Sequence, residues 1–123
     1  MTSELAALPV LYLTTTGRLT GLPREIEIWF VALGGKLYLL AEHFHRARWV
    51  RNIQNDARVR VRLGDREYLA LGRVLDPLQD RELWRQAQEA GRAKYGWGEG
   101  LPVEITIVAG PENTPRSAPR STA

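Results

Sequence analysis

The chain has 123 residues, 44% of them hydrophobic and 25% charged, which is the composition of one globular domain. It has no cysteine and no apolar run close to the roughly 20 residues of a membrane span, which excludes disulfides, thiolate metal sites and a spanning helix and favours a cytoplasmic location. The formal net charge of +3 is small for a nucleic-acid-binding protein, and no nucleic-acid-binding module is visible.

The first half of the chain predicts three strands followed by a short helix. Apolar and β-branched residues fill 10–16. Over 24–33 the side chains would alternate between two faces, one with Ile26, Ile28 and Phe30 and the other with Glu25, Glu27 and Trp29. Gly34-Gly35 then makes a tight hairpin into a third strand over 36–41. Trp49 and Ile53 are four residues apart, which is the spacing of neighbours on a helix, so we expect a helix over 46–55.

Residues 57–63 predict a strand with two different faces. Val59, Val61 and Leu63 point to one side, and arginines at 58, 60 and 62 point to the other. The apolar face is expected to lie inward. A row of charges at strand spacing usually forms a solvated face or protects the edge of a sheet.

The second half predicts two more strands around a long helix. A strand is expected over 66–75, where Gly72 marks a bulge or a close backbone approach. The helix is expected over 76–96, with Asp76 as its N-cap and Pro77 in its first position. A last strand covers 102–109.

Six strands joined mostly by hairpins, with two helices, indicate a mainly β protein with some helix (α+β), built as a small antiparallel barrel. Residues 1–110 would form this one domain. Residues 111–123 contain three prolines and no large apolar side chain, so we expect a disordered tail there.

The turn after the first strand, TTTGRLTGLPR (14–24), is the first candidate site. Its backbone N–H groups could form an anion-binding nest, with Arg18 and Arg24 adding charge from two sides. The alternative is a plain surface hairpin whose glycines only supply positive φ. The composition of the turn leaves both interpretations open.

The segment EHFHRARWVRN (42–52) is the second candidate. His43 and His45 lie two residues apart with no third ligand nearby, so no metal site is predicted. The start of the following helix could offer free N–H groups to a phosphate, beside Arg46 and Arg48. Only two of the 17 basic residues are lysines, and the planar fork of arginine suits phosphate and carboxylate.

The sequence has no nucleophile elbow, no phosphate-binding GxxxxGK[ST] loop and no dinucleotide GxGxxG pattern. If the protein is an enzyme, a bound cofactor is expected to carry the chemistry.

Three segments, TTTGRLTGLPREIEIWF, GGKLYLLAE and RWVRNIQNDARVRVRLGD, resemble the deazaflavin-dependent nitroreductase family of the flavin-binding split-barrel superfamily, which is related to pyridoxamine 5'-phosphate oxidase-like proteins. The resemblance runs from about Val10 to Ile107. It implies a split β-barrel, a homodimer, and hydride transfer from coenzyme F-420, or alternatively FMN, to a small-molecule acceptor of the quinone or nitro type.

The resemblance also implies where the cofactor binds. Its phosphate would lie at the turn, and its ring would lie beside the aromatic residues of the second strand and the helix. The cofactor-binding residues would then be Thr16, Gly17, Arg18, Thr20, Arg24, Trp29, Trp49 and Asn52. No catalytic side chain is implied.

Two departures from the family pattern concern the residues that would bind the anionic tail of F-420. Leu19 stands where many members have a second basic residue, and EHFHR replaces a Gly-Gly loop. Two other functions stay open: a split barrel that binds flavin, haem or another anionic ligand without turnover, and an interaction domain whose arginine face binds an acidic partner or nucleic acid.

Overall fold

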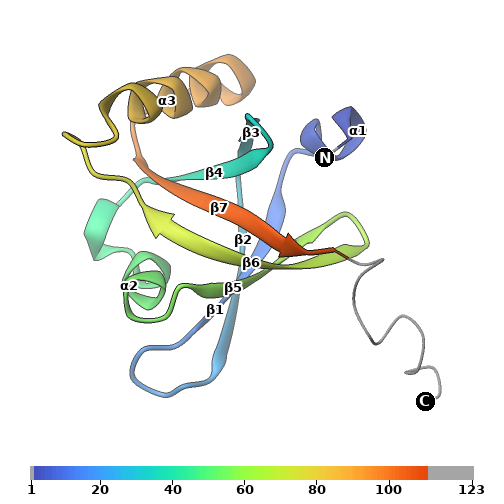
Figure 1. Cartoon of the computed structure of the whole chain (residues 1–123), viewed down its shortest axis with the longest axis vertical. Coiled ribbons are helices and arrows are strands. Elements are labelled where there is room, and N and C mark those ends of the chain that lie inside the picture. The colour runs from blue at the N-terminus through green and yellow to red at the C-terminus, as the bar shows by residue number, and fades with distance from the viewer. Residues whose placement is uncertain (1, 111–123) are drawn as a thin grey trace.

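The computed structural model describes residues 2–110, so the tail predicted at 111–123 lies outside the described residues. Within residues 2–110 the chain forms seven strands, three α-helices and one 3-10 helix, η1 (Figure 1). In chain order the elements are α1 (Ser3–Ala6), β1 (Leu11–Thr16), β2 (Pro23–Ile28), β3 (Val31–Leu33), β4 (Lys36–Ala41), η1 (Phe44–Arg46), α2 (Arg48–Asn55), β5 (Arg58–Leu63), β6 (Arg66–Val74), α3 (Arg81–Tyr95) and β7 (Leu101–Ala109).

The strands form one antiparallel sheet in the order β2-β1-β5-β6-β7-β4-β3. Its two edge strands, β2 and β3, are neighbours in the chain and are separated only by Trp29 and Phe30. The sheet therefore curls until its edges meet at this corner, which makes a half-barrel. The expected class, mainly β with helices, is confirmed, but the sheet has seven strands and not six, and three helices accompany it and not two.

The additional strand arises at the corner formed by Trp29 and Phe30. The alternating segment 24–33 was expected to be one strand, but β2 ends at Ile28 and β3 begins at Val31. The Phe30 N–H donates to the Tyr95 hydroxyl at 3.1 Å, and the Phe30 carbonyl accepts from the Lys94 ammonium at 2.9 Å. Because the end of α3 satisfies these backbone groups, the ladder can break here without leaving them unpaired.

The core fills the concave side of the half-barrel. Val59, Val61 and Leu63 are at most 4% exposed and point into it, as predicted. The arginines of β5 point outward, but β5 lies in the middle of the sheet, so the interpretation that they protect an edge is wrong. A second cluster, which includes Ala87 of α3 and Tyr38 of β4, lies where α3 covers the other side of the sheet.

Gly72 allows α2 to pack closely on β6. A Cβ atom at this position would lie 3.0 Å from Cγ2 of Ile53. The register shift between β6 and β7 falls between Leu69 and Ala70. Of the two predicted roles for Gly72, close approach is therefore confirmed and the bulge is not.

The helix boundaries differ from the predicted ones. α3 begins at Arg81, because Asp76 accepts from the N–H groups of Leu78 and Gln79 at 2.8 and 2.9 Å and so caps a separate turn before the helix. The helix predicted over 46–55 is divided into η1 and α2. No helix of the described residues has the length and apolar character needed to cross a membrane.

Candidate active site

Two clefts adjoin on one side of the half-barrel. The first, about 910 Å³, lies between the β1–β2 turn and the η1–α2 segment, and we call it the arginine cleft. The second, about 700 Å³, lies beside the corner between β2 and β3, and we call it the aromatic cleft. Ile26 and Trp49 line both, so the clefts share a boundary.

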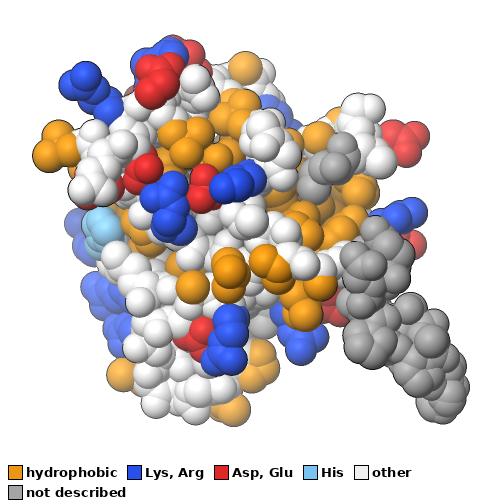
Figure 2. Space-filling view, viewed as in Figure 1, with side chains coloured by type: hydrophobic (Ala, Val, Ile, Leu, Met, Phe, Trp, Pro, Cys, Tyr) orange, Lys and Arg blue, Asp and Glu red, His pale blue; other side chains and the backbone are white. Residues whose placement is uncertain are grey.

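The arginine cleft is strongly positive. Arginines approach it from the turn and β2 on one side and from η1 and α2 on the other: Arg18, Arg24, Arg46, Arg48 and Arg51. In Figure 2, Lys and Arg side chains gather along the left edge of the molecule, over η1 and α2. The one carboxylate that lines the cleft, Glu25, lies 3.4 Å from Arg62 of β5. This excess of guanidinium groups attracts an anionic ligand.

Asn52 fixes the turn against α2. It is 6% exposed, and both ends of its amide are used: Nδ2 donates to Oγ1 of Thr15 at 3.0 Å, and Oδ1 accepts from the Arg18 N–H at 3.1 Å. The Gly17 N–H donates to the Leu22 carbonyl at 2.8 Å. The N–H groups of Gly17 and Arg18 are therefore not free to form an anion-binding nest, which was one of the two interpretations of this turn, and the side chains are left to contact an anion.

Gly17 is required by crowding and not by a positive φ. A Cβ atom there would lie 2.8 Å from Oγ1 of Thr20 and 3.5 Å from Nε of Arg24. The left-handed residue of this turn is Gly21, at φ 74°. Because Gly17 has no side chain, the Thr20 hydroxyl can lie close to the backbone of the turn at the edge of the cleft.

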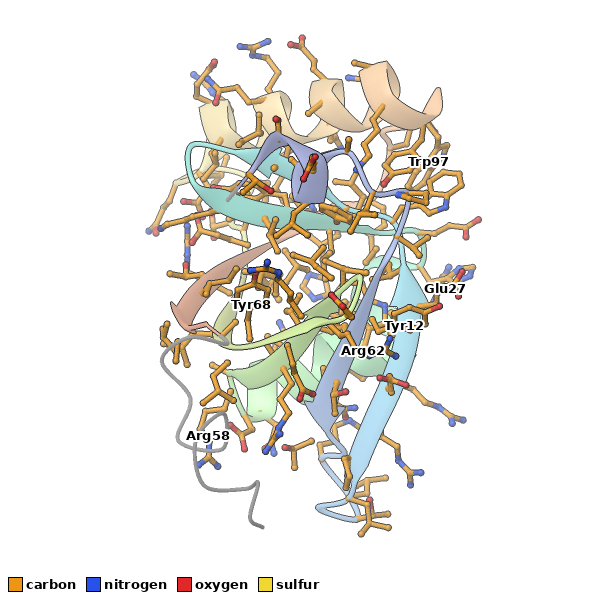
Figure 3. The ribbon with its side chains drawn as sticks, turned by 90° about the vertical axis from the view of Figure 1, so that its right-hand side faces the viewer. Tyr12, Glu27, Arg58, Arg62, Tyr68 and Trp97 are labelled. Carbon is orange, nitrogen blue, oxygen red and sulfur yellow. The ribbon has the colours of Figure 1, made fainter. Side chains whose placement is uncertain are left out.

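The aromatic cleft has flat apolar walls. The rings of Trp29 and Tyr95 stack with centroids 4.3 Å apart and an interplanar angle of 6°. Phe30, Trp49 and Trp97 also line the cleft. In Figure 3, Trp97 lies on the same side of the molecule as Glu27, which also lines the cleft.

A polar row on the outer face of the sheet reaches this cleft (Figure 3). The Tyr12 hydroxyl donates to Oε1 of Glu27 at 3.1 Å, which raises the pKa of Tyr12. Arg62 covers the Tyr12 ring at 4.1 Å and pairs with Glu25 at 3.4 Å. The row holds Glu27 at the rim of the aromatic cleft.

The structure brings most of the predicted cofactor-binding residues together. Trp29 lines the aromatic cleft, and Trp49 lines both clefts. Thr16 lines neither, because the alternation of β1 turns Thr15 toward the cleft instead. The remaining predicted residues line the arginine cleft: Gly17, Arg18, Thr20, Arg24 and Asn52.

Several lining residues were not among those predicted. Arg46, Arg48 and Arg51 belong to the arginine-rich run that was visible in the sequence, but only the fold brings that run opposite the turn. Tyr95 and Trp97 lie about 65 residues beyond the corner they face. No cluster of three or more potential metal ligands occurs within residues 2–110.

The two clefts fit a ligand with a planar ring at one end and an anionic tail at the other. Arginine side chains from two directions match a phosphate or carboxylate group. Stacked tryptophan and tyrosine rings match a flat heterocycle. At Gly17 a Cβ atom would lie 2.8 Å from Oγ1 of Thr20, so a side chain at this position would displace Thr20 in the turn that borders the positive cleft.

Comparison with known proteins identifies the family of the chain. The model of the family described as F420H(2)-dependent quinone reductase matches residues 1–109. A solved structure described as an F420-H2 dependent reductase (FDR-A) is 27% identical with a TM-score of 0.58, over 81% of this chain and 94% of the other. A second, described as a domain-swapped dimer, is also 27% identical with a TM-score of 0.58, over 81% of this chain and 80% of the other.

A third solved structure, an FAD-binding protein from Mesorhizobium loti, is 17% identical with a TM-score of 0.64, over 88% of this chain and 87% of the other, and it supports the fold alone. No curated protein matched the chain.

Proposed function

The chain belongs to the F420H(2)-dependent quinone reductase family, and we propose that it transfers hydride from reduced coenzyme F-420 to a small quinone- or nitro-type acceptor. The family is a family of oxidoreductases and implies F-420, and not FMN, as the cofactor. The observation that supports the proposal most is the pair of adjoining clefts, one positive and one aromatic, which share Trp49.

Each cleft would have its own task. Arg18 and Arg24, with Arg46, Arg48 and Arg51 opposite, would hold the anionic tail of the coenzyme. Trp29 and Trp49 would bound its ring, with Thr20 and Gly17 shaping the turn and Asn52 fixing it. When bound, the reduced coenzyme supplies the hydride. The chain supplies orientation and an environment from which aromatic side chains exclude water.

The acceptor would enter the aromatic cleft. Trp29 is 48% exposed at its mouth, and the Trp29–Tyr95 stack offers a flat surface to a planar apolar molecule. This environment suits a quinone or a nitroaromatic compound better than a charged metabolite, because burying an unpaired charge against these rings would be costly.

Membership in a family of enzymes argues against the alternative that the protein only carries a flavin, haem or another anionic ligand. We also propose that residues 1–110 act as one cofactor-binding domain, that two copies form a homodimer, and that the protein works in the cytoplasm.

A binding titration followed by turnover tests the proposal. We expect the purified protein to quench F-420 fluorescence with a micromolar or lower dissociation constant and to bind FMN more weakly. With reduced F-420 it should reduce menadione and a nitroimidazole, followed by the return of F-420 absorbance. Absence of F-420 binding at tens of micromolar would refute the proposed function, and binding without turnover of either acceptor would refute the acceptor class.

A further inference from the structure

Reducing a quinone requires a proton as well as a hydride. A hydride adds one hydrogen nucleus and two electrons to the quinone and leaves a hydroquinone monoanion. A second proton must then reach its oxygen. Five side chains lining the aromatic cleft can gain or lose a proton: Glu27, Tyr38, Glu42, His43 and Tyr95.

The two tyrosines are poorly suited to give up a proton. The Tyr38 hydroxyl donates to the carboxylate of Glu104 at 3.0 Å, and burial together with this bond raises the pKa of Tyr38 to about 12. The Tyr95 hydroxyl lies 2.8 Å from the carbonyls of Pro9 and Phe30, and burial raises the pKa of Tyr95. Both hydroxyls are engaged in holding the fold.

The two carboxylates are also unsuitable. Glu27 accepts the hydrogen bond from Tyr12 at 3.1 Å, and Glu42 lies 4.0 Å from the His43 ring. A carboxylate ordinarily carries no proton near neutral pH and accepts hydrogen bonds without donating them. Imidazole is the side chain that ordinarily changes its charge between pH 5 and 8.

His43 lies at the start of a tight backbone turn. Phe44, the next residue, has a φ of 51°, which is a left-handed conformation that a bulky residue rarely adopts. The carbonyl of His43 accepts from the Arg46 N–H at 3.0 Å, which closes the turn behind it. The imidazole lies between the wall of the cleft and water, since its side chain is 65% exposed.

We propose that His43 is the catalytic proton donor to the reduced acceptor in the aromatic cleft. This inference rests on the proposed function. The N–H bond of the imidazolium breaks as the O–H bond of the hydroquinone forms, and both electrons of the N–H bond stay on the nitrogen. The neutral ring then regains a proton from water at its exposed side. The carboxylate of Glu42 lies 4.0 Å from Nε2 of the ring.

His45 provides a matched control for the kinetic test. It lies two residues away, lines neither cleft, and has its Nδ1 3.5 Å from the Gln54 side-chain amide. With reduced F-420 and menadione, we expect His43→Asn to lower kcat at pH 7 by about 10- to 100-fold, up to the lower end of general-acid effects. It should also abolish the loss of activity as the pH rises through the imidazole titration. Added imidazole should restore part of kcat, and His45→Asn should behave like the unaltered protein.

A second measurement needs neither coenzyme nor turnover. NMR of the cofactor-free protein follows the titration of both histidines with and without 2-hydroxy-1,4-naphthoquinone, whose anion resembles the oxyanion of the product. Because a nearby anion favours the charged imidazolium, we expect the His43 midpoint to rise by about 0.5 to 1 pH unit and that of His45 to stay in place.

Two results would overturn the assignment. One is a His43→Asn variant that binds F-420 and retains the kcat and pH profile of the unaltered protein. The other is a His43 midpoint that does not respond to the naphthoquinone. Failure of the unaltered protein to bind F-420 would instead refute the proposed function, and the naphthoquinone titration would then show only whether His43 faces an anion bound in the aromatic cleft.

Discussion

Arg18 is the residue on which the proposed binding of the coenzyme depends most directly. Its side chain lines the arginine cleft, while its N–H is held by Asn52 at 3.1 Å. We expect Arg18→Ala to weaken F-420 binding by about 1.5 to 3 kcal/mol, the range for a hydrogen bond to a charged group. That corresponds to roughly a 10- to 150-fold higher Kd in a fluorescence titration. Arg58→Ala is the control, because Arg58 lines neither cleft and pairs with Asp56.

The same titration separates a direct contact from a positioning role. If Asn52 acts by holding the turn that carries Arg18, Asn52→Ala should weaken binding in the unaltered protein but have little further effect in Arg18→Ala. A coupling energy of about 1 kcal/mol or more is expected for residues joined in this way. An unchanged Kd together with a lower melting temperature in Arg18→Ala would make this arginine structural and contradict the proposal.

Single residues also show what the sequence could and could not predict about the site. The glycine turn with its two arginines was recognisable, because residue types that bind phosphate stand next to each other there. The use of Thr15 instead of Thr16 depends on the phase of β1, and the engagement of the Arg18 N–H depends on Asn52, which is 34 residues away. The pattern of neighbouring residues in the sequence predicts neither the phase of β1 nor the contact between Arg18 and Asn52.

At the scale of elements, the least predictable feature is the corner between β2 and β3. The residues that follow Ile28, WFVAL, are all apolar and include no glycine or proline, so the sequence of 24–33 favours one long strand. The break depends on Tyr95 and Lys94, whose side chains bind the Phe30 backbone from 65 and 64 residues away. Two strands were predicted within one residue of their bounds: β4, which follows a pair of glycines, and β5, whose sequence alternates clearly.

A buried polar group ties the start of α3 to the sheet. Glu104 of β7 is 7% exposed and accepts from the Tyr38 hydroxyl at 3.0 Å and from Nε of Arg73 at 3.2 Å. Arg73 also pairs with Asp80, just before α3, at 3.0 Å. We expect Tyr38→Phe to lower the free energy of unfolding by about 1 kcal/mol, because one buried hydrogen bond is lost without a large cavity.

The pH dependence of unfolding supplies the matching test. The pKa of Tyr38 is raised from 10.0 to about 12 in the folded protein, so its contribution to stability is fully present below pH 10 and is lost as the pH rises through about 12. Urea unfolding between pH 9 and 11.5 should show less of this decline in Tyr38→Phe than in Tyr68→Phe. No hydrogen bond of the Tyr68 hydroxyl is found within the described residues. Equal declines in the two variants would show that Tyr38 does not titrate as stated.

At the scale of the whole molecule, the outer face of β6 and β7 is unusually apolar. Leu69, Leu71 and Val108 are 43%, 45% and 57% exposed and point away from the core. Figure 2 shows hydrophobic side chains across this part of the surface. Leu71 and Leu69 lie opposite Arg58 and Arg60 of β5. An apolar centre flanked by arginines is the composition expected of a protein–protein interface.

We expect a second copy of the chain to cover this face, in keeping with the similar structure described as a domain-swapped dimer. Leu71→Glu would place two carboxylates in the apolar centre of a symmetric interface, where burying a charge is costly even beside Arg58, so light scattering should show the variant as a monomer where the unaltered protein is a dimer. Leu78→Glu is the control, since Leu78 is 82% exposed and lies before α3, away from the β6–β7 face. If Leu71→Glu stays dimeric with an unchanged dissociation constant, the partner must occupy a different surface.

Because Leu71 lines neither cleft, F-420 binding measured on the same samples then decides whether the coenzyme site needs the second copy: an unchanged Kd in the monomer would mean that one chain forms the site alone.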